Sequence, residues 1–563
     1  MIGSMTVAQY AVRQMQAWGI ETVFGVPGDT LLPLLEELRR AGSPRFIVCR
    51  HEGSAAMMAS AYAKLTGRVA ACLADAGPGA VQMLNGVYDA WMDRVPLLAI
   101  TGELPAQQRG LRWPQDAGLD ALFREATAFS HTLSAPGQAC AVFAHALRKS
   151  LLASRPVRIG VPADMWTQGC GPVAVELPPK DFGGRVETRD DRIREAAAWL
   201  ESARRPVLFA GLGCRGAAGP LLALAERLQA PIVHSMPAIG MLPPEHPWNL
   251  GVVGKFGTQA AADVLAEADV ILAAGTTWWQ PEFFPAGARV IQVDRAVDHI
   301  GYTFPVDLGV WGDAGDVLSR LAEATSRVHR PEWAHRVAHA RRAHEAEAAE
   351  VPTAGGPLHP AAVVQALSGH LVPDAVVALD VGNHAFWFSR YYRGPQVRVL
   401  LSGHWRSTGF ALPAGIGAKL AAPARQVVVF AGDGGFAMSM AELATAVQHG
   451  LPIACIVLRD GRYAEEESLQ RRLGREPFGT RLHNPDWAAY AHSCGVDGYR
   501  VETFEQLTAA LARALPALAQ GRAAVLDVAV AAVEPRYARP GQAFRDGRLL
   551  DAVLAGAQAP ASR

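Results

Sequence analysis

The segment that decides the fold begins Val427-Val428-Val429-Phe430-Ala431-Gly432-Asp433-Gly434-Gly435 and ends Ile453-Ala454-Cys455-Ile456-Val457-Leu458-Arg459-Asp460-Gly461. Its two apolar runs, Val427 to Phe430 and Ile453 to Leu458, are too short for helices and stop at glycine or polar residues, as buried parallel strands do. The stretch between them suits a helix. The segment therefore predicts a strand, a helix and a second strand of an α/β sheet.

Glycines and carboxylates follow both predicted strands. Asp433 lies within Gly432 to Gly435, and Asp460 follows the second strand. Because ligands bind beyond the carboxyl ends of parallel strands, we expect both carboxylates at one rim of the sheet. Glycines there let backbone N–H groups approach a phosphate, and Asp433 offers the hard oxygen ligand that Mg²⁺ prefers. The alternative is that Gly432 to Gly435 and Asp460-Gly461 are ordinary turns.

The composition excludes several classes of function. The chain has 563 residues, enough for about three domains. Lysine plus arginine and aspartate plus glutamate number 53 each, so no net charge draws the protein to nucleic acid or to an anionic membrane. Seven scattered cysteines indicate reduced thiols rather than disulfides or a zinc site. With no leader-like N-terminus and no apolar run long enough to span a bilayer, we expect a soluble, cytoplasmic protein.

Segments rich in proline and glycine divide the chain into three blocks. They occur at Cys170 to Gly184 and at Val351 to Pro360, and each block alternates apolar strands with amphipathic helices. This alternation is typical of doubly wound parallel sheets. We therefore predict three such α/β domains and a C-terminal tail, at residues 1–175, 186–345, 357–535 and 536–563.

A further candidate site residue lies in the first block. The predicted strand Phe46 to Cys49 leads into Arg50-His51-Glu52-Gly53, and the helix that follows stops near Gly67. Glu52 is therefore expected where a strand ends and a helix begins. The alternative to a catalytic role is a carboxylate that is simply favourable at a helix N-terminus.

Several segments, in this order, resemble one enzyme family. They are Phe24-Gly25-Val26-Pro27-Gly28, His51-Glu52-Gly53-Ser54-Ala55-Ala56, Ala76-Gly77-Pro78-Gly79, Asp93-Arg94-Val95-Pro96-Leu97 and the segment around Asp433. Together they resemble the thiamine-diphosphate enzymes of the acetolactate synthase and pyruvate oxidase family, over essentially the whole chain. The resemblance implies a pyrimidine-binding domain, a middle domain and a diphosphate-binding domain.

The resemblance also implies a metal site. Mg²⁺ would be held by Asp433, Asp460 and the backbone carbonyl of Arg462. The family has Asn-Asn where this chain has Arg459-Asp460. An aspartate ligates Mg²⁺ as an asparagine does, but it adds negative charge beside a diphosphate, and Arg459 is a candidate to offset that charge.

Three residues are implied to be catalytic. Glu52 would hydrogen-bond the pyrimidine nitrogen of the cofactor and promote formation of its ylid nucleophile, and a carboxyl against an apolar ring has a raised pKa. Gln115, in Pro114-Gln115-Asp116 where the family has Phe-Gln-Glu, would contact substrate; the alternative is a surface loop glutamine. Glu466 matches a glutamate that assists proton transfer in related decarboxylases; the alternative is a solvated helix start.

The remaining candidates are contacts to the cofactor. Asn383 and His384 lie in a segment that resembles the one touching the diphosphate, although a lone histidine is more often structural. Thr408 stands where the family has a larger apolar wedge beneath the thiazolium, which is a departure. The full set of implied cofactor contacts is Gly28, Glu52, Asn383, His384, Thr408, Gly432, Asp433, Gly434, Gly435 and Asp460.

The middle block contains a literal G-x-G-x-x-G, Gly211 to Gly216, after a predicted strand Pro206 to Ala210. The next strand, Ile232 to Ser235, is not followed by the acidic residue that a ribose needs, so a strand-to-helix turn is favoured over a nicotinamide site. Pyruvate oxidases and acetolactate synthases bind FAD in this domain, whereas other family members have the same domain without a flavin. Trp278-Trp279-Gln280-Pro281 replaces an arginine often found there, so FAD is an alternative that we do not favour.

The predicted function is thiamine-diphosphate-dependent decarboxylation of a pyruvate-like 2-oxo acid, with protonation of the enamine or carboligation to an aldehyde or ketone. The alternatives are an FAD-dependent pyruvate oxidase and a catalytically silent homologue that binds a cofactor or a partner. The resemblance implies a homodimer or homotetramer with active sites between subunits. The predicted cofactors are thiamine diphosphate and Mg²⁺, and neither nucleic acid nor a membrane is an expected partner.

Overall fold

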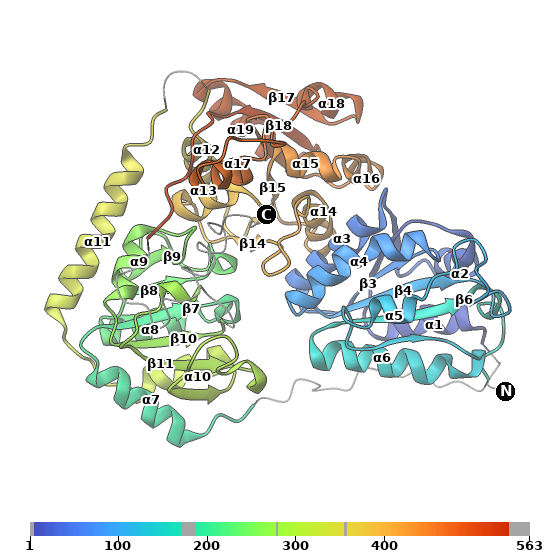
Figure 1. Ribbon diagram of the computed structural model, residues 1–563, viewed down its shortest axis with the longest axis horizontal. Helices are drawn as coiled ribbons and strands as arrows, with labels where there is room; N and C mark the ends of the chain where they lie inside the picture. The colour runs from blue at the N-terminus through green and yellow to red at the C-terminus, as the bar shows by residue number, and fades with distance from the viewer. Residues whose placement is uncertain (1–4, 172–185, 277–279, 354–356, 540–563) are drawn as a thin grey trace, which may run out of the picture.

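The computed structural model describes residues 5–171, 186–276, 280–353 and 357–539 (Figure 1). Three separate sheets organise these residues, each with six strands that are all parallel to their neighbours. The predicted α/β class with three doubly wound sheets is confirmed. Each predicted segment contains one sheet, while the exact domain boundaries stay predictions. None of the described helices is both long and apolar enough to cross a membrane.

The N-terminal unit has the strand order β2-β1-β3-β4-β6-β5. Its central strands are continuous apolar runs because helices cover both faces of the sheet. α3 begins at Glu52 and ends before Gly67, whose φ of 71° suits glycine, as predicted. The elements of this unit are β1 Thr22–Gly25, β2 Arg45–Val48, β3 Ala70–Ala74, β4 Leu97–Glu103, β5 Ser130–Thr132, β6 Pro156–Pro162, α1 Val7–Ala17, α2 Leu32–Ala41, α3 Glu52–Thr66, α4 Pro78–Met92, α5 Leu119–Phe123 and α6 Ala139–Ala153.

The middle unit has the strand order β12-β11-β10-β7-β8-β9. The helix α11 runs along its outside toward the C-terminal unit (Figure 1). The elements of this unit are β7 Pro206–Ala210, β8 Ile232–His234, β9 Asn249–Val252, β10 Val270–Ala274, β11 Arg289–Asp294, β12 Leu308–Trp311, α7 Asp190–Ser202, α8 Ala218–Leu228, α9 Gln259–Ala266, α10 Ala314–Ala324 and α11 Pro331–Ala349.

The C-terminal unit has the strand order β14-β13-β15-β16-β18-β17. β15 and β16 are the two strands predicted first, and they pair directly. The stretch between them forms two short helices, α15 and α16, rather than the single predicted helix. The elements of this unit are β13 Val376–Leu379, β14 Arg398–Leu400, β15 Val427–Gly432, β16 Ala454–Arg459, β17 Asp497–Val501, β18 Ala524–Ala529, α12 Pro360–Ser368, α13 Asn383–Tyr391, α14 Ala411–Ala421, α15 Asp433–Ser439, α16 Glu442–Gln448, α17 Ala464–Arg472, α18 Trp487–Ser493 and α19 Phe504–Ala517.

The N-terminal and C-terminal units meet through helices and buried charges. α3 and α14 approach so closely that a Cβ added to Gly417 would lie 2.3 Å from the carbonyl oxygen of Met58. At the end of α3 the Lys64 ammonium lies 2.8 Å from Asp89, 2.7 Å from Asp93 and 3.0 Å from the carbonyl of Leu401 in the other unit. These groups are almost fully buried, so the two carboxylates depend on the Lys64 ammonium to balance their charge.

Substituting Lys64→Met should lower the free energy of unfolding by about 3–5 kcal/mol, because it leaves two buried carboxylates without their cation. Urea unfolding followed by circular dichroism measures the change. Lys149→Met, on the exposed side of α6, is the matched control and should change stability by less than about 0.5 kcal/mol. Equal stability of the two variants would contradict this account of the interface.

Candidate functional site

Asp433 lies at the centre of the C-terminal cluster of site residues. It follows β15 directly, and its side chain is 2% exposed. Its carboxylate accepts hydrogen bonds from the N–H groups of Gly434 (2.9 Å) and Gly461 (2.8 Å) and from the amide of Asn484 (2.7 Å). Burial, together with the nearby charge of Asp460, raises the pKa of Asp433 to about 6. The residues that follow β15 and β16 therefore lie close together, as expected.

The charge of Asp460 is balanced by Arg462, not by Arg459 as expected. The Arg462 guanidinium lies 2.9 Å from Asp460 and 2.8 Å from the fully buried Glu467. Arg459 instead points to Asp527, at 2.7 Å. An aspartate is tolerated at position 460 because a buried arginine two residues further on neutralises it. These ion pairs use only the side chain of Arg462, and its backbone carbonyl stays the third predicted metal ligand.

The exit of β13 holds polar atoms that lack partners. The side-chain oxygen and nitrogen of Asn383 and the Nε2 of His384 are buried and have no hydrogen-bond partner among the described residues. Burial lowers the pKa of His384 to about 4, so the imidazole is neutral at neutral pH. Buried polar groups are normally hydrogen-bonded, so this set indicates a polar ligand at the rim.

Asp380 holds the loop that contains Thr408. Its buried carboxylate accepts hydrogen bonds from the N–H groups of Val381 (2.7 Å) and Gly409 (2.9 Å). Burial raises the pKa of Asp380 to about 6, although the N–H donors favour the charged form. Thr408 is half-buried beside Gly409. Asp380 is not among the residues predicted from the sequence, although its position immediately after the buried strand β13 was a signal that could have identified it.

Glu52 lies in a second cluster, at the rim of the N-terminal sheet. It is the first residue of α3, half-buried, and its carboxylate has no hydrogen-bond or ion-pair partner in the described part of the chain. A Cβ added to Gly79, at the start of α4, would lie 3.0 Å from the Glu52 carboxylate. Gly28 follows β1 and packs against Asp75, which follows β3. The residues that follow three adjacent strands, β2, β1 and β3, therefore form this cluster.

Two of the predicted catalytic residues lie on the surface of the chain. Gln115 is exposed in the loop before α5, has a φ of 69°, and places its backbone against Gly77. Glu466 is exposed in the first turn of α17. Its neighbours do not form the solvated helix start that was the alternative, because Glu465 is half-buried and Glu467 is fully buried. The roles of Gln115 and Glu466 stay predictions.

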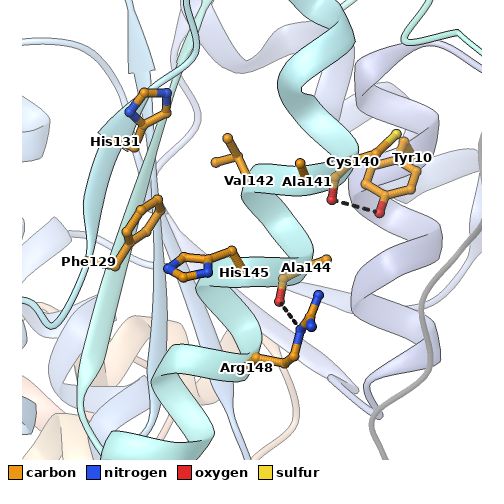
Figure 2. A pocket seen from close by; sticks show the side chains of 9 residues that line it. All are labelled: Tyr10, Phe129, His131, Cys140, Ala141, Val142, Ala144, His145 and Arg148. Atoms are coloured by element: carbon orange, nitrogen blue, oxygen red, sulfur yellow. Dashed lines mark hydrogen bonds between the residues drawn. The ribbon is translucent and has the colours of Figure 1, made fainter.

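Among the described residues, no hydrogen bond or ion pair connects Glu52 with Asp433 or Asp460. The N-terminal cluster holds Gly28, Glu52 and Gln115, and the C-terminal cluster holds the other predicted residues. A surface hollow of about 730 Å³ beside α6 lies apart from both (Figure 2). None of the predicted site residues lines it.

The G-x-G-x-x-G segment of the middle unit lies close to the loop that contains Gly275. A Cβ added to Gly211 would lie 2.2 Å from the carbonyl oxygen of Gly275, and α8 begins only at Ala218. This geometry agrees with the favoured strand-to-helix turn. Trp278 and Trp279, on which the expectation about FAD depended, lie outside the described residues.

The C-terminal cluster fits a diphosphate held through a hard divalent cation. It combines two carboxylates, a backbone carbonyl and the unpartnered polar atoms of Asn383 and His384. Among the residues that the structure describes, no group of three or more His, Cys, Asp and Glu side chains could hold a metal. The predicted site needs only two carboxylates, since carbonyl and phosphate oxygens complete the coordination of Mg²⁺.

Comparison with known families agrees with this geometry. Three family models match the chain in order: the N-terminal TPP binding domain of thiamine pyrophosphate enzymes at residues 5–122, their central domain at 193–321 and their C-terminal TPP binding domain at 380–528. Thiamine pyrophosphate is another name for thiamine diphosphate. Each matched range contains strands of one of the three sheets, and the outer two contain the two clusters.

Individual relatives match most of the chain. Protein YdaP of Bacillus subtilis is 32% identical over 523 residues, covering 91% of this chain and 89% of the relative. Sulfoacetaldehyde acetyltransferase of Rhodobacter capsulatus is 32% identical over 560 residues, covering 93% and 94%. The large subunit of acetolactate synthase isozyme 1 of Escherichia coli is 31% identical over 476 residues, covering 82% and 84%. The chain therefore belongs to the thiamine pyrophosphate enzyme family, in its acetolactate synthase and pyruvate oxidase group, and is a thiamine-diphosphate-dependent enzyme.

Proposed function

We propose that the protein decarboxylates a 2-oxo acid and then either protonates the remaining fragment or joins it to an aldehyde or ketone acceptor. The observation that carries this proposal is the rim of the C-terminal sheet, where buried carboxylates and unpartnered polar atoms form a place for a metal-bound diphosphate. The names of two relatives, a synthase of acetolactate and an acetyltransferase, support acyl transfer.

Thiamine diphosphate, when bound, supplies a carbon nucleophile and a sink for the electron pair left by CO₂. The chain would hold Mg²⁺ with Asp433, Asp460 and the carbonyl of Arg462. The side-chain nitrogen of Asn383 and a protonated Nε2 of His384 would donate hydrogen bonds to the diphosphate, which would satisfy these two buried nitrogen atoms. Gly28, Thr408 and the glycines at 432, 434 and 435 would line the rest of the cofactor site.

Glu52 would hold a proton at a ring nitrogen of the pyrimidine. Its carboxylate is available for this role because it has no partner in the described chain. Gln115 and Glu466 would assist at the substrate, Gln115 by orienting it and Glu466 by moving a proton. Closure over these exposed residues would exclude water from the reacting atoms.

The assembly that supports this chemistry is a homodimer or a homotetramer that acts in the cytoplasm. The lack of a hydrogen bond or ion pair between Glu52 and Asp433 or Asp460 in the described residues supports sites shared between subunits. In such an assembly the N-terminal rim of one subunit would face the C-terminal rim of another. The partner would then cover the rim at each cluster.

The alternative chemistry, an FAD-dependent oxidation, is distinguished by the visible spectrum of the purified protein. We expect no flavin band, together with CO₂ release from a 2-oxo acid when thiamine diphosphate and Mg²⁺ are added. A stoichiometric flavin band, with release that depends on an electron acceptor, would favour the oxidase instead.

Glu52→Gln should lower the rate of CO₂ release by roughly 100-fold or more, since an amide cannot hold and return the proton. Thiamine diphosphate binding, measured by calorimetry, should persist. Glu323→Gln, at an exposed position of α10, is the matched control and should keep full activity. Turnover that survives the Glu52 change would contradict the assigned mechanism.

Asp433→Asn should weaken the binding of thiamine diphosphate in the presence of Mg²⁺ by roughly 100-fold, because it removes the buried ionised metal ligand. Removal of Mg²⁺ with a chelator should weaken binding to the wild-type protein similarly and leave the variant little changed. Asp298→Asn, whose side chain is 82% exposed, is the control. Equal cofactor affinity in Asp433→Asn and wild type would place the metal elsewhere.

A further inference from the structure

Three cationic side chains gather around three aromatic rings where the middle and C-terminal units meet. We call this set the cation–aromatic cluster: Lys255, Arg406, Arg472, Phe256, Phe386 and Tyr537. Lys255 and Phe256 follow β9 of the middle unit, and Phe386 lies on α13 of the C-terminal unit (Figure 1). The cluster is therefore assembled only by the tertiary structure.

The aromatic rings form a floor on which the cations rest. Phe256 stacks on Phe386 with ring centroids 3.8 Å apart and an interplanar angle of 5°. The Lys255 ammonium lies 4.8 Å from the centroid of Tyr537, and the Arg472 guanidinium lies 3.9 Å from it. The Arg406 guanidinium lies 5.3 Å from the centroid of Phe256. These distances are those of cation–π contacts, which hold the cations in place without neutralising them.

The cations of the cluster are only partly paired with carboxylates: Glu282, Glu465, Glu466 and Glu534 act on the cluster, and one of them forms an ion pair with it. Glu465 lies 3.6 Å from Arg406. In the described part of the chain, neither Lys255 nor Arg472 has a carboxylate within ion-pair distance. Burial and the charges of Arg472 and Arg406 lower the pKa of Lys255, although Glu465 and Glu282 act in the opposite direction. The hydroxyl of Tyr537 is also buried without a hydrogen-bond partner among the described residues. An anion would relieve both conditions.

Three segments connect this cluster to the proposed cofactor site. Phe386 lies one helical turn after Asn383, Arg406 lies two residues before Thr408, and Glu465 precedes Glu466. Each segment thus contributes one residue to the proposed site and one to the cation–aromatic cluster or, for Glu465, to an ion pair with it. Arg406 has a φ of 56°, an uncommon conformation for a residue other than glycine. The cluster therefore lies beside the place where a substrate would be bound.

We propose that the cation–aromatic cluster binds an oxyanion group of a substrate, a carboxylate, phosphate or sulfonate that is remote from the reacting carbonyl. This inference rests on the proposed function for its position beside the reaction. The oxyanion would accept hydrogen bonds from Lys255, Arg472 and the Tyr537 hydroxyl. The apolar rings would contact the carbon chain that joins the oxyanion to the carbonyl. Specificity for such substrates would follow from charge as well as from shape.

Binding of inorganic phosphate provides the first test. Full-length protein loaded with thiamine diphosphate and Mg²⁺ is titrated with phosphate by calorimetry at constant ionic strength. Lys255→Met and Arg472→Gln should each weaken phosphate binding about tenfold, since each removes a charged hydrogen bond. The matched controls Lys149→Met and Arg475→Gln, at exposed positions, should leave it unchanged. Two separate cluster variants keep the test readable if one of them fails to fold.

Two matched donor substrates then distinguish where the oxyanion belongs. The compounds 2-oxoglutarate and 2-oxopentanoate have the same chain length, and only the first has a second carboxylate. The oxyanion belongs to the donor if the dicarboxylate has the lower KM and Lys255→Met raises that KM about tenfold while the monocarboxylate is unaffected. Equal KM values for the two donors, together with cluster-dependent phosphate binding, place the oxyanion on the acceptor or on free phosphate.

Wild-type phosphate affinity that no cluster substitution changes would overturn the inference, as would a wild type that binds no phosphate. The titration is repeated on cofactor-free protein, so that a failure of cofactor binding contradicts the proposed function alone. Likewise, Glu52→Gln should lose turnover and keep phosphate binding. The two proposals can therefore fail separately.

Discussion

The site depends on buried carboxylates at the carboxyl ends of neighbouring parallel strands in the C-terminal sheet. Asp433 and Asp380 are each 2% exposed, and each accepts hydrogen bonds from backbone N–H groups of segments far apart in the sequence. Burying a carboxylate costs free energy unless such donors surround it. The donors in turn fix the loops that begin after β13, β15 and β16. Hydrogen bonds of the chain itself therefore hold the rim together.

Charge at this rim is balanced over several residues rather than in pairs. Arg462 forms ion pairs with both Asp460 and Glu467, and the Arg471 guanidinium also lies 3.1 Å from the Glu467 carboxylate. Because Glu467 is fully buried, removing its cations would leave an uncompensated charge in the interior. This network explains how the chain accommodates Asp460 where the family pattern has an asparagine. It also explains why the run of three glutamates is not uniformly solvated.

The predicted fold follows closely from the sequence because its signals are local. The apolar runs at Val427 and Ile453 predict β15 and β16 to within two residues, and Gly67 predicts the end of α3. The motifs around Glu52 and Asp433 also lie at strand exits as predicted. These predictions agree with the structure because apolar runs and helix ends are encoded by residues that are close together in the sequence.

The sequence by itself determined the α/β class, the three sheets, the family and the strand exits that carry Glu52, Asp433 and Asp460. Only the tertiary structure decided that Arg462 rather than Arg459 balances Asp460, that Asp380 holds the loop of Thr408, and that Lys255 and Arg472 meet across two units. The reason is physical. Apolar periodicity is written along the chain, whereas ion pairs and cation–π contacts depend on distances between side chains that only the packed structure sets.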